Sequence, residues 1–147
     1  MEYEITIGLE THIMQKTKTK MFCGCLNLYN ALPNTNVCFV CLGYPGALPV
    51  INKKAVELCC KAGLLLGCNV NTFSKWDRKN YFYPDMAKNY QITQNDYPLC
   101  SNGFVEVEVK GKIKKFDIER IHQEENAAKN SHSVSYTHLT LPTKSSV

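Results

Sequence analysis

Two closely spaced cysteine pairs constrain this sequence more than any other feature. Cys23 and Cys25 form a Cys-x-Cys pair, and Cys38 and Cys41 form a Cys-x-x-Cys pair after a twelve-residue excursion. Each pair is short enough for two thiolates to reach one ion, and four sulfur ligands are typical of a structural zinc site that has no open position for catalysis. The residues between the pairs are rich in asparagine, so they have little apolar surface with which to hold a shape. We therefore predict a zinc-binding loop over residues 22–42; buried free cysteines in a loop are the alternative.

Length and charge narrow the class of protein. The chain has 147 residues and a formal net charge of +4, and this length fits one domain with its own core. No apolar run approaches the ~20 residues that a membrane span needs, and the first residues do not resemble a secretory signal. We expect a cytoplasmic protein with reduced cysteines and no membrane partner. The mild positive charge allows a nucleotide or nucleic-acid partner without establishing one.

Residues 3–14 alternate between apolar and polar side chains with the period of a β-strand. Ile5, Ile7 and Leu9 fall on one face, which we expect to join the core, while Glu10 and His12 fall on the other. A carboxylate beside an imidazole favours one wall of a metal or phosphate site. The alternative is an ordinary solvated strand face.

Further elements follow along the chain. Residues 15–20 are polar and basic, which indicates an exposed loop. Residues 52–67 have helical spacing with an asparagine at the N-cap, and residues 103–125 are predicted to form a β-hairpin that turns at Lys110 and Gly111.

At the end of the hairpin, His122 and Glu124 share a strand face and Glu125 points the other way. Two carboxylate–imidazole clusters on separate strands favour a shared divalent-cation site, and oxygen-rich ligands suit magnesium.

Residues 74–85 combine aromatic and basic side chains more densely than any other stretch. Arginine and lysine can hold phosphate groups, and tyrosine rings can stack on a base. The candidate ATP- or substrate-binding residues are Arg78, Lys79, Tyr81 and Tyr83. A half-buried aromatic strand is the alternative.

Several long motifs identify a family. IGLETH, the two cysteine pairs, PNTNVCFVCLGYPGALPVINKKAVE, DRKNYFYPDMAKNYQITQ and RIHQEENAAK resemble the N-terminal part of the B subunit (GatB) of the aspartyl/glutamyl-tRNA amidotransferases, the GatCAB complexes. The resemblance covers residues 3–132. It implies an α+β fold, namely an antiparallel-sheet cradle of the glutamine synthetase-like type with a zinc-binding loop.

The resemblance also implies a function. In this family GatB takes up mischarged Glu-tRNA(Gln) or Asp-tRNA(Asn) and uses ATP with magnesium to phosphorylate the side-chain carboxylate, which ammonia then converts to the amide. The implied partners are the amidase (A) subunit, which releases the ammonia, and the small (C) subunit. Phosphorylation turns a poor electrophile into one with a leaving group. By position in the motifs, Glu10, His12, Glu124 and Glu125 match the catalytic magnesium site, and Cys23, Cys25, Cys38 and Cys41 match the zinc of many members.

The chain departs from the family pattern in two places. Asn126 and Ala128 stand where the family usually has aspartate and glycine, and residues 133–147 match no family motif. Family members also continue well beyond this point. We therefore expect residues 1–132 to be a fragment of the kinase domain that is inactive alone, followed by a non-native or disordered tail over 133–147. A zinc-stabilised RNA-binding module without catalysis is the alternative function.

Overall fold

The structure is a computed structural model that describes residues 3–28, 31–132, 137–140 and 145–146. Its elements, in chain order, are α1 (Phe39–Leu42), α2 (Lys53–Leu65), β1 (Asn69–Val70), β2 (Asp77–Asn80), β3 (Tyr90–Thr93), β4 (Cys100–Val109), β5 (Lys112–Ile121), β6 (Glu124–Glu125), β7 (Lys129–His132), β8 (Thr137–Thr140) and β9 (Ser145–Ser146). Within these ranges, no helix is long and apolar enough to span a membrane.

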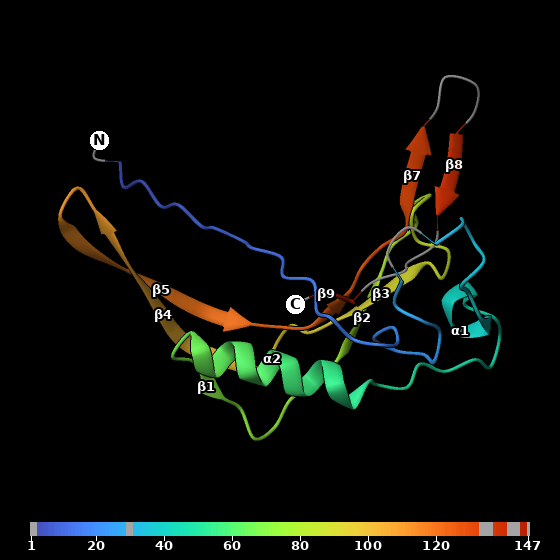
Figure 1. Cartoon of the computed structure of the whole chain (residues 1–147), viewed down its shortest axis with the longest axis horizontal. Helices are drawn as coiled ribbons and strands as arrows, with labels where there is room; N and C mark the ends of the chain where they lie inside the picture. Colours follow the sequence, from blue (N-terminus) through green and yellow to red (C-terminus); the bar gives the residue numbers. More distant parts are fainter. Residues whose placement is uncertain (1–2, 29–30, 133–136, 141–144, 147) are drawn as a thin grey trace.

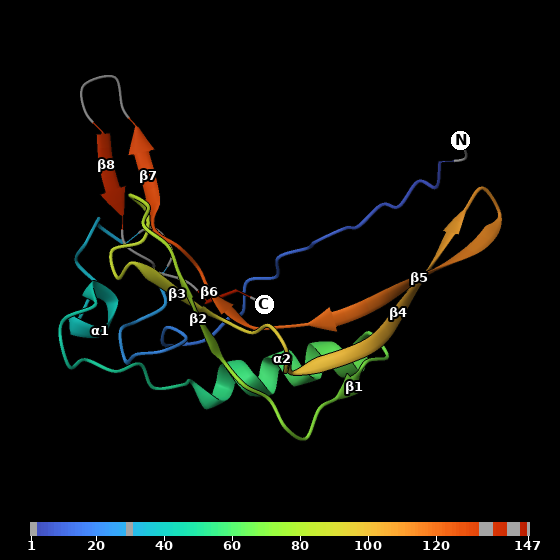
Figure 2. The same cartoon turned by 180° about the vertical axis from the view of Figure 1, so that it is seen from behind.

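The strands form small sheets in which every pair is antiparallel. One sheet has the order β1-β4-β5, and the pairs β2-β3, β6-β9 and β7-β8 make three two-stranded sheets. Figure 1 shows β4 and β5 as a long arm at one end of the molecule, with α1, β7 and β8 at the other end, and Figure 2 shows the same arrangement from behind. The predicted α+β class with antiparallel sheets is confirmed, whereas the glutamine synthetase-like cradle stays a prediction.

The β4–β5 hairpin forms where the sequence predicts it. Lys110 and Gly111 have φ angles of 53° and 73°. Positive φ at both central residues is the requirement of a type I′ turn, whose twist matches that of the flanking strands. The turn sets a register in which Val105 lies opposite Phe116 and Val109 lies opposite Lys112.

Helix α2 is also confirmed, together with its cap. The Asn52 side chain accepts hydrogen bonds from the backbone N–H groups of Lys54 and Ala55 at 2.9 and 3.4 Å. These bonds satisfy donors that the first helical turn leaves without partners. Asn52 also donates through its side-chain nitrogen to the Thr19 hydroxyl at 2.9 Å, so the helix start is tied to the segment that leads into the cysteine loop.

Helix α2 carries two small clusters of buried side chains. The first contains Met21, Phe22, Ala55 and Ile92, and the second contains Cys59, Cys68, Leu99 and Cys100. Trp76 packs against both clusters and therefore joins them. Because Phe22 directly precedes Cys23, the first cluster fixes one side of the cysteine loop.

The predicted strand over residues 3–14 is wrong in this structure, because no strand includes residues 3–13. Figure 1 shows this segment as an extended trace outside the sheets. Ile5, Ile7 and Leu9 are 86%, 79% and 87% exposed, so the face that we expected to join the core lies in solvent. Alternation indicates which face a strand would bury, but a strand forms only where a neighbouring strand supplies its hydrogen bonds.

Residues 15–20 form a loop as predicted, but the prediction that this loop is exposed holds only in part. Gln15, Thr17 and Lys20 are buried, while Lys16 and Lys18 between them are exposed. The Gln15 side-chain nitrogen donates to the Ala55 carbonyl at 2.9 Å, and Gln123 donates to the same carbonyl at 2.7 Å. Polar side chains that the chain buries in this way must form hydrogen bonds inside the protein.

The segment that we predicted to be a non-native or disordered tail is only partly described. Its described residues form β8, which pairs with β7, and β9, which pairs with β6. Residues 133–136, 141–144 and 147 lie outside the described residues. The division into residues 1–132 and a separate tail stays a prediction.

Gly103 provides a test of packing between β4 and the end of α2. A Cβ added there would contact the Cys68 sulfur and would lie 2.7 Å from the Leu66 backbone carbonyl, which cannot rotate away. We expect Gly103→Ala to lower the free energy of unfolding by about 1–3 kcal/mol, measured by urea denaturation. Gly8→Ala is the control, because nothing lies within 4 Å of its added Cβ. Equal midpoints for the two variants would contradict this packing.

Candidate metal centre and carboxylate cluster

The first cysteine pair lies on a short turn held by backbone hydrogen bonds. Lys20 N–H donates to the Cys25 carbonyl, and Asn27 N–H donates to the Lys18 carbonyl, both at 2.9 Å. Thr19 and Leu26 form an antiparallel bridge beside these bonds. The turn therefore brings Cys23 and Cys25 to one side of the loop.

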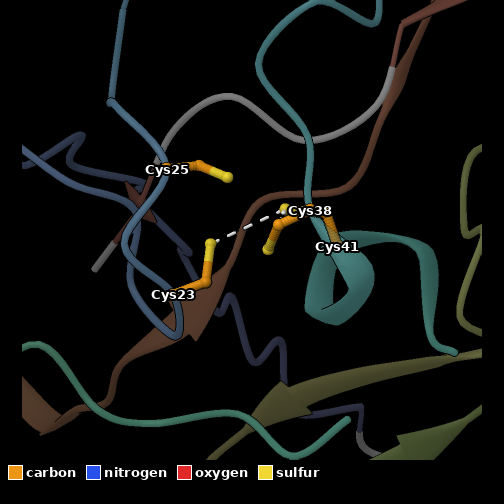
Figure 3. A group of neighbouring side chains, drawn as sticks. All are labelled: Cys23, Cys25, Cys38 and Cys41. Atoms are coloured by element: carbon orange, nitrogen blue, oxygen red, sulfur yellow. Dashed lines mark hydrogen bonds between the residues drawn. The ribbon is translucent and has the colours of Figure 1, made fainter. Parts of the chain in front are cut away.

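The second cysteine pair lies at the start of α1. Cys38 is the N-cap residue and Cys41 lies in the helix, so one turn separates them. Figure 3 shows all four sulfur-bearing side chains turned toward one another. The four sulfur atoms lie within 4.8 Å of one another, with 3.6 Å between Cys23 and Cys41 and 3.8 Å between Cys38 and Cys41. The predicted convergence of the two pairs is confirmed, and the cluster could hold a metal ion.

The electrostatic environment favours an ionised sulfur within this cluster. Hydrogen bonding from the Cys23 thiol lowers the pKa of Cys41 to about 4, and the nearby Lys20 ammonium acts in the same direction. The same hydrogen bond and burial raise the pKa of Cys23 above its ordinary value, and burial raises the pKa of Cys25 to about 11. A divalent cation would replace those thiol protons, because thiolates are the metal-binding form of cysteine.

The second cluster forms around Glu124. His12 Nδ1 lies 3.4 Å from one carboxylate oxygen of Glu124, and His122 Nε2 lies 3.8 Å from the other. The Thr93 hydroxyl lies 3.4 Å from Glu124 Oε2. Hydrogen bonding from His122 lowers the pKa of Glu124, and His12 and Thr93 add to this effect, although burial opposes it. The structure thus brings together residues from both motifs that the sequence singles out.

Glu125 lies on the opposite side of the chain in a buried ion pair. Lys88 Nζ lies 2.5 and 2.6 Å from the two carboxylate oxygens, and the side chains of Lys88 and Glu125 are only 3% and 11% exposed. Ile92 N–H also donates to the carboxylate at 2.8 Å, and the Gln91 side chain donates to the Glu125 carbonyl at 2.7 Å. The carboxylate of Glu125 is therefore turned away from His12 and Glu124 in this structure.

Glu10 is exposed, and within the described part of the chain its carboxylate forms no ion pair with the histidines around Glu124. Among the described residues, only the four cysteines form a group of three or more potential ligands in which all donor atoms lie within 4.8 Å of one another. The structure thus joins His12 to Glu124 but keeps Glu10 and Glu125 apart from them.

The candidate ATP-binding residues lie along and just after β2. The Arg78 guanidinium lies 4.2 Å from the centre of the Tyr90 ring and lines a cavity of about 390 Å³ with Trp76. Lys79 lies 5.7 Å from the Tyr81 ring, on the opposite face of the strand. The two basic side chains therefore do not converge on one point.

The two tyrosines have different surroundings. Burial, and then the carboxylates of Asp85, Glu125 and Glu124, raise the pKa of Tyr81. Tyr83 is 68% exposed.

Sequence reasoning missed the buried lysines. Lys20 and Lys88 are each less than one-tenth exposed, and both line a cavity of about 30 Å³ with Cys23, Cys41 and Glu125. This small cavity lies between the cysteine cluster and the Lys88–Glu125 pair. No periodic pattern marks either lysine; the available signal is that an apolar or aromatic residue follows one or two positions later, Met21 after Lys20 and Tyr90 after Lys88.

These features define a small α+β domain with antiparallel sheets, a tetracysteine cluster and a glutamate–histidine cluster. A family model described as the GatB/GatE catalytic domain matches residues 5–143. The chain belongs to this family. It is 60% identical over 132 residues, or 90% of its length, to the B subunit of the aspartyl/glutamyl-tRNA(Asn/Gln) amidotransferase of Thermoanaerobacter sp. (strain X514). It is 52% identical over 141 residues, or 96% of its length, to the protein of the same name from Persephonella marina (strain DSM 14350 / EX-H1).

The chain is much shorter than these relatives. It spans 28% of the Thermoanaerobacter protein and 30% of the Persephonella protein, and it corresponds to the N-terminal portion of GatB. The predicted resemblance to GatB is confirmed.

Proposed function

We propose that this chain is the N-terminal part of a subunit that uses ATP to phosphorylate the side-chain carboxylate of Glu-tRNA(Gln) or Asp-tRNA(Asn), for amidation to Gln-tRNA(Gln) or Asn-tRNA(Asn). The observation that supports it best is the contact between His12 and Glu124, because it joins the IGLETH and RIHQEENAAK motifs at one place. The names of the relatives support an amidotransferase in protein biosynthesis. The alternative of an RNA-binding module without catalysis is not favoured, since the matching family is described as a catalytic domain.

In this proposal His12 and Glu124 hold magnesium together with Glu10, which would have to move toward them, and the ion would neutralise charge on the phosphoryl group during its transfer. The carboxylate ligands suit magnesium, and the histidine ligand would also accept manganese. Glu125 would have to leave Lys88 to join them. If it does not, its contribution is to fix the position of Glu124, which is its neighbour in β6.

The basic and aromatic residues have separate parts in the proposal. Arg78 and Lys79 lie on opposite faces of β2, so we assign them to different groups of the ATP or tRNA substrate. Tyr81 lies near the carboxylates and would face the reacting groups, whereas the exposed Tyr83 ring would stack on a base. The four cysteines would hold a structural zinc ion that supports the loop without taking part in catalysis. The proposed partners are the A and C subunits of the amidotransferase, with the complex in the cytoplasm.

The test uses full-length GatB, assembled with its partner subunits. We expect Glu124→Gln and His12→Ala each to reduce ATP-dependent formation of ADP in the presence of mischarged tRNA by about 10²-fold or more. Each substitution removes a proposed ligand of the magnesium ion that would stabilise charge in the transition state. Affinity for the tRNA, measured by filter binding, should change little.

Glu4→Ala is the matched control, because Glu4 is an exposed carboxylate on the same extended segment as His12. Full ADP formation by both cluster variants would overturn the assignment of this site. Equal losses in ADP formation and tRNA affinity would instead support a binding role and count against the catalytic one.

A further inference from the structure

Lys20 carries a buried positive charge beside the cysteine cluster. The residue is only 5% exposed. Its ammonium donates to the Asn36 carbonyl at 2.6 Å and to the Cys41 sulfur at 3.3 Å. Among the described residues, no carboxylate lies within ion-pair distance of this ammonium. A buried ammonium needs a nearby anion to offset its lost hydration, and the Cys41 sulfur is the contacting group that can supply one.

Lys20 also connects the two halves of the cluster. Its backbone N–H donates to the Cys25 carbonyl at 2.9 Å, which places it in the turn that carries Cys23 and Cys25. Its side chain reaches across to Asn36 and Cys41, in the half that begins α1. One residue therefore bridges both cysteine pairs without the help of an ion.

The charge of the proposed metal centre explains why the residue that bridges the two cysteine pairs is a cation. Four thiolates around one divalent ion leave a net negative charge, and burial makes that charge costly. An ammonium that donates to one of the sulfurs offsets part of this charge and orients the ligand. Hydrogen-bond donors around metal ligands commonly change metal affinity by about 10–100-fold.

We propose that Lys20 is a positioning residue of the metal centre: its ammonium holds the Cys41 thiolate toward the ion and thereby increases the affinity of the four-cysteine cluster for zinc. This inference rests on the proposed zinc occupancy. It assigns to the chain a metal-site residue that lies outside the cysteine motif, and it accounts for the burial of a lysine close to two exposed ones.

The test compares zinc affinity among three variants of the full chain, measured by competition with a chromophoric chelator at neutral pH. Lys20→Met removes the charge and keeps most of the side-chain volume. Lys20→Gln keeps a donor without the charge. Lys18→Met is the matched control, because Lys18 is exposed and two residues away. We expect a loss of about 10–100-fold in Lys20→Met, a similar or smaller loss in Lys20→Gln, and no change in Lys18→Met.

Two further measurements separate a metal-site role from a structural one. Protons compete with the ion for the thiolates, so the pH at which half the zinc is released should be higher in Lys20→Met than in the unaltered chain. Substituted cobalt should show the same sulfur-to-metal absorption bands in both, because the four ligands are unchanged. Thermal unfolding of the metal-free chains shows whether the substitution disturbs the fold without zinc.

The outcomes are distinguishable. A zinc affinity of Lys20→Met within about twofold of that of the unaltered chain overturns the Lys20 inference, since loss of a donor to a metal ligand should lower the affinity by about tenfold or more. An equal loss of zinc affinity in Lys18→Met overturns the inference too. A loss of zinc affinity that is matched by an equal loss in the free energy of unfolding of the metal-free chain also overturns it, because the substitution then acts on the fold and not on the metal site. An unaltered chain that takes up neither zinc nor cobalt overturns the metal centre itself.

Discussion

Cys41→Ser is expected to abolish the proposed zinc binding and to unfold the zinc-binding loop over residues 22–42. Cys41 contacts Cys23, Cys38 and Lys20, so it is the most connected member of the cluster. Structural zinc sites in small peptides bind with apparent free energies of about 10–16 kcal/mol, and this binding free energy stabilises the folded loop. The measurements are zinc per chain by metal analysis and amide hydrogen exchange over the loop.

Cys60→Ser is the control, because Cys60 is half-buried and lies outside the cluster. We expect it to retain about one zinc per chain with unchanged exchange in the loop. Removal of zinc from the unaltered chain with a chelator should reproduce the Cys41→Ser result. A Cys41→Ser chain with bound zinc and a protected loop would show that the four sulfurs do not act as one site.

The parts of the fold that the sequence predicts are those determined by local chemistry. Asn52 caps α2 through its own side chain, and Lys110 with Gly111 closes the β4–β5 turn through backbone angles. The cysteine cluster is predictable for a similar reason, because each pair is close in sequence and both have the ligand chemistry of one ion. The cysteine cluster then forms once the fold brings the two short segments that carry the pairs together.

The errors arise where a residue depends on a distant partner. The segment that contains Ile5 and Leu9 has the alternation of a strand, but no periodic pattern can supply the neighbour that a strand needs. Lys88 and Glu125 are 37 residues apart in sequence, and nothing near either residue indicates that they pair. The sequence correctly places Glu124 and Glu125 on opposite faces, but it does not show that Glu125 faces a buried cation.

Lys88→Met is expected to lower the free energy of unfolding by about 3–5 kcal/mol, because it leaves the Glu125 carboxylate buried without its counter-charge. Chemical denaturation of the chain measures this loss. The control is Lys54→Met, which breaks the exposed Lys54–Glu57 pair and should cost at most about 1 kcal/mol. Similar losses in the two variants would contradict a buried pair.

The double replacement Lys88→Met with Glu125→Leu separates the charge effect from packing. Apolar side chains of similar size often replace a buried ion pair at little cost, so this chain should be more stable than Lys88→Met alone. A double-mutant cycle then gives the interaction between the two residues. If the double replacement is as unstable as Lys88→Met, the loss comes from the changed packing at position 88 and not from an unpaired carboxylate. If it recovers stability, the loss in Lys88→Met comes from the unpaired buried carboxylate of Glu125. In the unaltered chain that carboxylate bonds to Lys88 and to the Ile92 N–H of β3, and these contacts position β6 and its neighbouring Glu124 where His12 and His122 meet it.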